Sequence, residues 1–195
     1  MRDGDDRDCM AINVCVLGVG LAGLTFHVPF VLALPGLFSL HSVLERNPSS
    51  PAGKVHDRFG VAIKIHRSLD HVLHDPQIDL VIVATPNQTH YDFAKAALQA
   101  GKHGIIPLSS VTYLLTILVL VDKPVTATAA QARELGVIAR EKGLVLYAYQ
   151  NRRWDSDFLS LKRLLVLPRS SPQSLGPLIE FSSQQVLPHA ISPLT

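Results

Sequence analysis

The sequence predicts an α/β fold, a Rossmann-type doubly wound parallel sheet. Short aliphatic runs alternate with amphipathic, Ala-rich segments, which is the pattern of strand–helix units joined by right-handed crossovers. One run, residues 79–85 (DLVIVAT), is almost wholly aliphatic, as expected for a strand that is covered on both faces. Another, residues 12–17, leads directly into the glycine-rich stretch GVGLAG. Together these observations predict strands that alternate with covering helices.

The composition excludes several classes of protein. The 195 residues are 47% hydrophobic and 17% charged, with a formal net charge of +2, which is typical of a globular chain. The longest apolar stretch, residues 105–121, is broken by Pro107 and by hydroxyl side chains, and it is shorter than the roughly 20 residues of a spanning helix. We therefore expect neither nucleic acid nor a membrane as a partner, and the sequence is compatible with an oligomer.

Cysteine and histidine usage favours a cytoplasmic protein without a metal site. The N-terminus has no signal-peptide pattern, and the two cysteines suit a reducing compartment. Cys15 lies inside the first apolar run and is expected to be buried rather than nucleophilic. The nine histidines show no ligand spacing for zinc, so no metal is expected.

The expected elements alternate along the chain after a charged tail at residues 1–11. Strands are expected at residues 12–17, 37–45, 61–66, 79–85 and 144–150. Helices are expected at residues 21–33, 91–101 and 128–142, with a short one after Ser68, whose side chain can cap the first turn. Each longer helix ends at a glycine or a Pro-Gly pair, which is a common helix stop.

The glycine motif predicts a dinucleotide site. It consists of Gly18, Val19, Gly20, Leu21, Ala22 and Gly23, between a predicted strand and a predicted helix. In this context Gly18 can make the tight turn, Gly20 lets backbone approach a pyrophosphate, and Gly23 lets the helix pack closely on the strand. Free amide groups at the helix N-terminus then face the phosphates. The alternative is a glycine-rich turn without a function.

Residues at the end of the second predicted strand are expected to set the preference between NAD and NADP. An acidic residue at that place hydrogen-bonds the adenosine ribose, and Glu45 occupies it, slightly later than the usual spacing. Arg46 follows and could stack on adenine or meet a 2′-phosphate, so both NAD and NADP stay open. We favour NAD, because the carboxylate would repel a phosphate. The alternative is that both residues belong to a solvated loop.

Four further motifs follow in order. The first, ATPNxxH, leaves the fourth predicted strand and contains Thr85, Pro86, Asn87 and His90. The second is GKH at residues 101–103, and DKP follows with Asp122, Lys123 and Pro124. The fourth is QNRRW at residues 150–154. With the glycine motif, this series resembles the Gfo/Idh/MocA family of NAD(P)-dependent oxidoreductases over about residues 12–184.

The resemblance implies a fold, an activity and site residues. Members have a Rossmann domain followed by an α/β domain with a large open sheet, and they oxidise or reduce a hydroxyl of sugars, inositols and related polyols. By resemblance, Lys123 lies near the nicotinamide and the substrate hydroxyl, where it can hydrogen-bond the reacting oxygen and help to move its proton. Asp122 and the ATPNxxH residues would lie at the cofactor. His90 is either a partner of the cofactor or the N-terminal residue of a helix.

The chain departs from the family pattern at about residues 104–118, which we interpret as an insertion before DKP. A helix-to-strand connection lies at the amino edge of a parallel sheet, opposite the cofactor, and such loops tolerate insertions. The cofactor edge therefore survives if residues 118–121 enter the sheet. The alternative is that residues 114–120 take the strand position in a slipped register, which would misplace Asp122 and Lys123.

We expect two domains of unequal extent. Residues 12–150 form the dinucleotide-binding domain, and residues 151–195 form the truncated start of a substrate domain, with its first strand at residues 175–184. Two functions are compatible with this organisation. One is an NAD(P)-dependent oxidoreductase whose substrate domain is incomplete in this chain, and the other is a non-catalytic dinucleotide-binding remnant or mis-spliced product.

Overall fold

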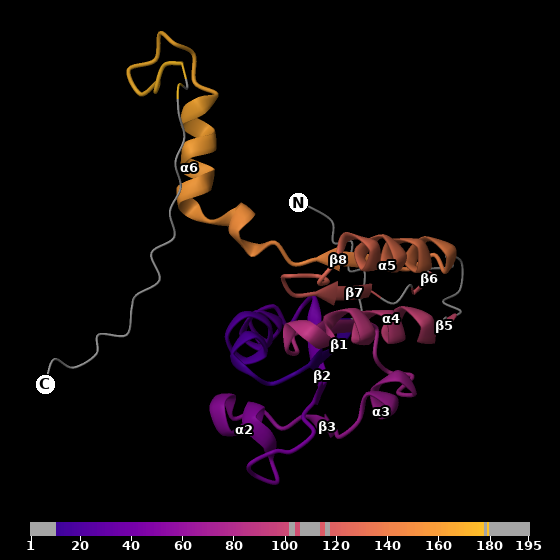
Figure 1. The fold of residues 1–195 in the computed structure, drawn as a ribbon. Coiled ribbons are helices and arrows are strands. Elements are labelled where there is room, and N and C mark those ends of the chain that lie inside the picture. The colour runs from indigo at the N-terminus through magenta and orange to yellow at the C-terminus, as the bar shows by residue number, and fades with distance from the viewer. Residues whose placement is uncertain (1–10, 102–103, 106–113, 116–117, 178, 180–195) are drawn as a thin grey trace, which may run out of the picture. The chain divides into compact units, whose positions relative to one another are not determined.

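The computed structural model describes residues 11–101, 104–105, 114–115, 118–177 and 179 (Figure 1). The chain divides into two compact units, Met1–Gln150 and Asn151–Thr195. Most of the predicted tail, the GKH residues Lys102 and His103, and most of the predicted strand at residues 175–184 lie outside the described residues.

The first unit is built on a six-stranded parallel sheet, drawn as arrows in Figure 1. Its strands are β1 (Ile12–Leu17), β2 (Phe38–Leu44), β3 (Lys64–His66), β4 (Leu80–Val83), β7 (Leu118–Val121) and β8 (Val145–Ala148). They lie in the order β3-β2-β1-β4-β7-β8, which is the doubly wound Rossmann order. The predicted fold class is confirmed; β1 has the predicted bounds, and the other strands are shorter than the predicted runs.

Helices cover both faces of this sheet. The chain is helical from residue 21 to residue 33, first as a π-helical segment, η1 (Gly23–His27), and then as α1 (Val28–Ala33). The remaining helices of the unit are α2 (Gly53–Phe59), α3 (Leu69–Leu73), the 3-10 turn η2 (Asn87–Thr89), α4 (His90–Ala100) and α5 (Ala129–Glu141). Among the described residues, none of the helices combines the length and hydropathy of a membrane span.

Alternating side chains of the strands supply two cores. Val14 and Val16 of β1 pack with α1 and α2 on one face, whereas Cys15 and Leu17 pack with α3, α4 and α5 on the other. All four side chains are fully buried. Burial on both faces explains the almost unbroken aliphatic runs of the central strands. The expectation that Cys15 is a buried strand residue is confirmed.

Helix caps agree with the sequence signals. Ser68 accepts a hydrogen bond from the amide of His71 at the start of α3. Thr128 and Gln131 form a reciprocal capping box at the start of α5. The sequence analysis did not predict α2, because the turn-rich RNPSSPAG stretch before it suggested a loop. The apolar spacing of Val55 and Phe59 is the signal that could have indicated this helix.

The strand before DKP is paired in the register that keeps the carboxyl ends of β4 and β7 level. Leu118 pairs with Leu80, and Val121 pairs with Val83. The structure therefore does not show the slipped register. Because Leu118 belongs to β7, an insertion at this place ends by residue 117. Within it, β5 (Gly104–Ile105) and β6 (Leu114–Leu115) form an antiparallel pair.

The second unit begins with a short 3-10 turn, η3 (Asn151–Trp154), followed by α6 (Ser156–Leu165). Asp155 precedes α6 in extended conformation and accepts a hydrogen bond from the Arg152 guanidinium at 2.8 Å. The sequence analysis did not predict α6.

Candidate functional site

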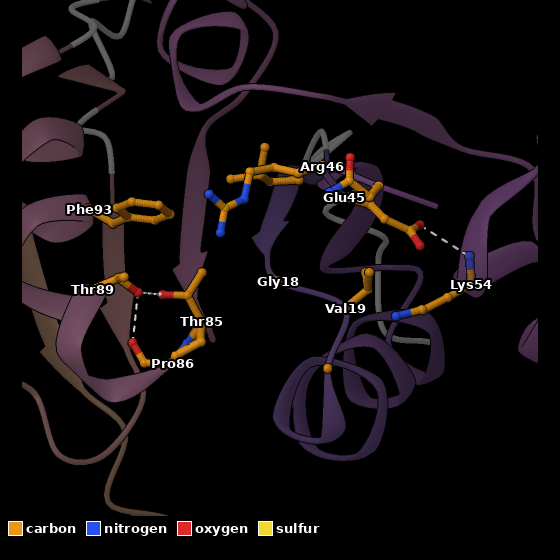
Figure 2. Close-up of a pocket in the computed structure, with 12 residues that line it drawn as sticks. Gly18, Val19, Glu45, Arg46, Lys54, Thr85, Pro86, Thr89 and Phe93 are labelled. Carbon is orange, nitrogen blue, oxygen red and sulfur yellow. Dashed lines mark hydrogen bonds between the residues drawn. The ribbon is translucent and has the colours of Figure 1, made fainter. Parts of the chain in front are cut away.

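A pocket opens at the carboxyl ends of β1, β2 and β4, where the strand order changes direction. Its lining includes these predicted site residues: Gly18, Val19, Gly20, Glu45, Arg46, Thr85 and Pro86 (Figure 2). It also includes residues that the sequence analysis did not single out: Leu44, Asn47, Lys54, Thr89 and Phe93. The remaining predicted residues do not line this pocket: Leu21, Ala22, Gly23, Asn87, His90, Asp122 and Lys123.

The three motif glycines have different surroundings. Gly18 has a φ of +99°, and a Cβ there would lie 2.8 Å from the carbonyl oxygen of Ala84. A Cβ at Gly23 would collide with the carbonyl oxygen of Gly18. Gly20 has nothing within 4 Å of a Cβ position. Gly18 and Gly23 are therefore needed for the turn itself, whereas Gly20 leaves room for a ligand.

Glu45 follows β2 directly and is 4% exposed. Its Oε2 accepts a hydrogen bond of 3.1 Å from the amide of Lys54, in the first turn of α2. Gly53 allows this approach, because a Cβ there would lie 2.8 Å from Oε2. Among the described residues, Oε1 of Glu45 has no hydrogen-bond partner. A buried carboxylate oxygen without a partner is costly, so this atom favours a donor on a ligand.

Two cationic side chains line the pocket. Arg46 and Lys54 both line it, and Figure 2 shows the Arg46 side chain extending away from the Glu45 carboxylate. The carboxylate turns toward the backbone of Lys54. The pocket lining therefore combines one buried carboxylate with two exposed cations.

The segment after β4 forms the opposite wall. The Thr89 hydroxyl lies 2.7 Å from both Thr85 Oγ1 and the carbonyl oxygen of Pro86, which folds this segment into η2. Phe93 of α4 lines the same wall (Figure 2). Thr89 and Phe93 lie within and just after the ATPNxxH motif, at positions that the motif leaves unspecified.

His90 is the first residue of α4 and is 1% exposed. Its Nδ1 lies 2.7 Å from the carbonyl oxygen of Pro124, and its Nε2 lies 2.7 Å from the carbonyl oxygen of Thr85. Carbonyl oxygens only accept hydrogen bonds, so both contacts become hydrogen bonds only when both ring nitrogens carry a proton. His90 thus connects the loop after β4 to the loop after β7.

Asp122 and Lys123 follow β7 at the same edge of the sheet. Asp122 is 8% exposed, and its Oδ1 accepts a 2.7 Å hydrogen bond from the amide of Lys123. Its Oδ2 lies 3.4 Å from Nε2 of His27, a residue that the sequence analysis did not select. The Lys123 side chain is exposed. In the described part of the chain, no group of three or more His, Cys, Asp or Glu residues could hold a metal ion.

Residues 12–108 match the family model described as oxidoreductase family, NAD-binding Rossmann fold, of the Gfo/Idh/MocA group. The chain belongs to the Gfo/Idh/MocA family of oxidoreductases. This family has an NAD(P)-binding Rossmann fold, which agrees with the strand order and with the glycine turn.

Members of the Gfo/Idh/MocA family resemble this chain over most of its length. It is 37% identical to the oxidoreductase C115.03 of Schizosaccharomyces pombe, over 88% of this chain and 41% of that protein. It is 38% identical to scyllo-inositol 2-dehydrogenase (NADP(+)) IolW of Bacillus subtilis, over 82% of this chain and 38% of that protein. The structure of GenD2 from gentamicin A biosynthesis, in complex with NAD, matches with a TM-score of 0.62 and 28% identity, over 79% of this chain and 38% of GenD2. The chain thus spans about two fifths of the length of these relatives.

Proposed function

We propose that this chain is the dinucleotide-binding part of an oxidoreductase that acts on a sugar, a polyol or a related hydroxyl or carbonyl compound. Oε1 of Glu45 carries the proposal, because it is a buried acceptor without a partner among the described residues. A ribose hydroxyl supplies the donor that this oxygen lacks. The other support is the open space beside Gly20, at the turn between β1 and the helical segment.

In this proposal different pocket residues bind different parts of the cofactor. The turn at Gly18 and Gly20 receives the pyrophosphate on main-chain amides. Glu45 holds the adenosine ribose, while Thr85 and Pro86 form the wall on the β4 side. A bound nicotinamide supplies the hydride acceptor or donor of the reaction. Asn87 and Asp122 would lie beside the cofactor in the segments that follow β4 and β7, and His90 would hold these two segments together through its contacts with Thr85 and Pro124.

We propose that Lys123 transfers the proton of the reacting substrate oxygen. Its amide is held by Asp122, and its exposed side chain lies in the loop that His90 links to the end of β4. During oxidation the neutral amine would accept the proton of the substrate hydroxyl, and during reduction the ammonium would hydrogen-bond the carbonyl oxygen and donate a proton to it. IolW is named as a dehydrogenase of scyllo-inositol, which supports a polyol as the substrate class.

We also infer a preference for NAD over NADP. A 2′-phosphate would lie beside the carboxylate of Glu45, which already has one unpaired and buried oxygen. Arg46 and Lys54 would offset part of this repulsion, because both line the pocket. GenD2 in complex with NAD supports the preference, whereas the name of IolW specifies NADP(+).

The glycine turn offers the first test. Gly20→Val places a side chain in the space that the pyrophosphate needs, so we expect calorimetry to show loss of NADH binding. The melting temperature should stay near that of the parent chain, because a Cβ at Gly20 meets no atom within 4 Å.

Gly36→Val is the matched control for this substitution. Gly36 also has nothing within 4 Å of a Cβ position, and it does not line the pocket. This variant should bind NADH as the parent does. Unchanged NADH affinity in Gly20→Val would contradict the proposed site.

A further inference from the structure

A cluster of three side chains joins three elements at the carboxyl edge of the sheet. His27 ends η1 and precedes α1, Asp122 follows β7, and Tyr149 follows β8. The ring centroids of His27 and Tyr149 lie 4.8 Å apart, and Nε2 of His27 lies 3.4 Å from Oδ2 of Asp122. His27 is 3% exposed although it carries a polar ring. A buried histidine at this place therefore depends on Asp122 as its hydrogen-bond partner.

The charges in the cluster determine which atom donates. Burial lowers the pKa of His27, and the opposing effect of the Asp122 carboxylate is smaller, so the imidazole is neutral at pH 7. A neutral imidazole has a single N–H. Because Asp122 can only accept when it is ionised, Nε2 must carry that proton. The contact thus selects one tautomer of His27.

The same carboxylate also holds the main chain of the DKP loop. Its Oδ1 accepts the 2.7 Å hydrogen bond from the amide of Lys123, while Oδ2 faces His27. The amide of Asp122 itself donates to the carbonyl oxygen of Val83 at 2.9 Å. Asp122 is therefore attached to the end of β4, to the DKP loop and to the helical segment that follows the glycine turn.

The position of His27, on the other side of its contact with Asp122, depends on the glycine turn. Gly23 lies directly against the carbonyl oxygen of Gly18, and its own carbonyl oxygen accepts a hydrogen bond from the amide of Val28. His27 therefore sits one helical turn beyond the close contact at Gly23. A displacement of the turn at Gly18 would move the imidazole relative to Asp122.

We propose that His27 is a positioning residue for Lys123: its Nε2–H holds the Asp122 carboxylate and so sets the DKP loop relative to the glycine turn. The inference rests on the proposed function, which places Lys123 at the reacting hydroxyl. The carboxylate that His27 retains is thereby kept from pairing with the Lys123 ammonium. Without His27 the carboxylate would be released to form that ion pair.

The test is the rate at which the Lys123 amine is reductively methylated in the folded full chain, followed by peptide mass spectrometry. His27→Leu removes the donor, so the released carboxylate should pair with Lys123 and slow its methylation about fivefold, the factor equivalent to one hydrogen bond of ordinary net strength. His27→Gln keeps an N–H donor and should restore most of the rate. In His27→Leu/Asp122→Asn the slowing should be absent, because the released group no longer carries a charge.

His74→Leu is the matched control, because His74 forms its contact with Asp70 at the surface, where both side chains are more than 70% exposed. It should leave the Lys123 rate unchanged. A rate in His27→Leu equal to that of the parent would overturn the proposal, as would equal slowing in His27→Leu and His27→Leu/Asp122→Asn.

Two further measurements use chains that retain His27. Nitrogen NMR of the parent should show the Nε2–H tautomer of His27, and the Nδ1–H tautomer would overturn the proposal. Asp122→Asn should lower the pKa of His27, because the carboxylate raises it in the parent. An unchanged pKa of His27 would show that the contact is absent in solution.

Calorimetry with NADH on the same parent sample separates this inference from the proposed function. Absence of NADH binding would refute the proposed function, while the methylation rates and the tautomer would still report on His27 and Asp122.

Discussion

At the scale of single residues, Glu45 shows how one side chain serves both the fold and the proposed site. Oε2 accepts the amide of Lys54 at the start of α2, and Oε1 is buried without a partner among the described residues. The first contact attaches α2 to the end of β2. Oε1 leaves the carboxylate with an acceptor that no hydrogen bond satisfies among the described residues.

Glu45→Gln should raise the affinity for NADP relative to NAD. The amide retains an acceptor for Lys54 but removes the charge, and a charge of this kind beside a phosphate is worth on the order of tenfold in affinity. Titrating both cofactors by calorimetry gives the ratio. Glu141→Gln, on α5 and outside the pocket, is the control. If the ratio is the same in both variants and in the parent, Glu45 does not select the cofactor.

At the scale of elements, Asp75 joins β2, β3 and the turn after α3. Its buried Oδ2 lies 2.8 Å from Nζ of Lys64 and 3.2 Å from Nε2 of His41. Nε2 of His66 lies 3.3 Å from the same oxygen without forming a hydrogen bond. Burial opposes ionisation of Asp75, but hydrogen bonds from Lys64, Gln77 and His41 outweigh it and hold the pKa of this carboxyl well below its usual range.

This cluster predicts a pH dependence of stability with two causes. Burial, followed by the charge of Lys64, lowers the pKa of His66, so the unfolded chain binds this proton more readily. Stability should therefore fall as the pH drops below about 6.5. The stabilisation from Asp75 is present above about pH 4 and is lost as the pH falls from there toward its lower folded pKa.

Asp75→Asn should lower the free energy of unfolding at pH 7 by about 2 kcal/mol, because Lys64 loses its ionic partner. The decrease below pH 4 should be shallower than in the parent. Urea unfolding at several pH values measures both effects. Asp70→Asn is the control, since Asp70 makes its contact with His74 at the surface. Parallel curves for the parent and Asp75→Asn below pH 4 would contradict the assignment.

At the scale of the whole molecule, the two ends of the connection from α4 to β7 lie at the amino edge of the sheet, away from the pocket. The chain leaves α4 at Ala100 and re-enters the sheet at Leu118, whose amide donates to the carbonyl oxygen of Asp79. After this connection β7 pairs regularly with β4 and β8, which is compatible with the insertion hypothesis.

Deleting residues 104–117 should raise the melting temperature and leave NADH binding unchanged. Shortening the connection to residues 101–103 lowers the entropic cost of closing it by about 1.5 kcal/mol. The deletion also removes apolar residues that are liable to aggregate. Scanning calorimetry measures the change. Deletion of residues 105–118 is the control of equal length, because it removes Leu118 from β7 and should lower the melting temperature. A lower melting temperature for the first deletion would contradict the insertion hypothesis.

By itself the sequence determined the fold class and most of its elements. Aliphatic runs, helical periods and glycine stops are local signals, and they predicted β1, β4, α4 and α5 because each element is encoded by neighbouring residues. The motif series likewise predicted the family and the edge of the sheet where Gly18, Glu45 and Thr85 meet. Local patterns failed at α2, whose short amphipathic stretch follows a turn-rich segment.

Only the tertiary structure decided which distant residues face one another. His27 and Asp122 are 95 positions apart in the chain, and nothing in either local pattern indicates their contact. The contacts of the His90 ring nitrogens with the carbonyl oxygens of Thr85 and Pro124 are likewise not indicated by the motif that contains His90. The physical reason is that parallel strands bring their carboxyl ends together through crossovers of variable length. Side chains at that edge therefore meet through the order and register of the strands, which local sequence does not specify.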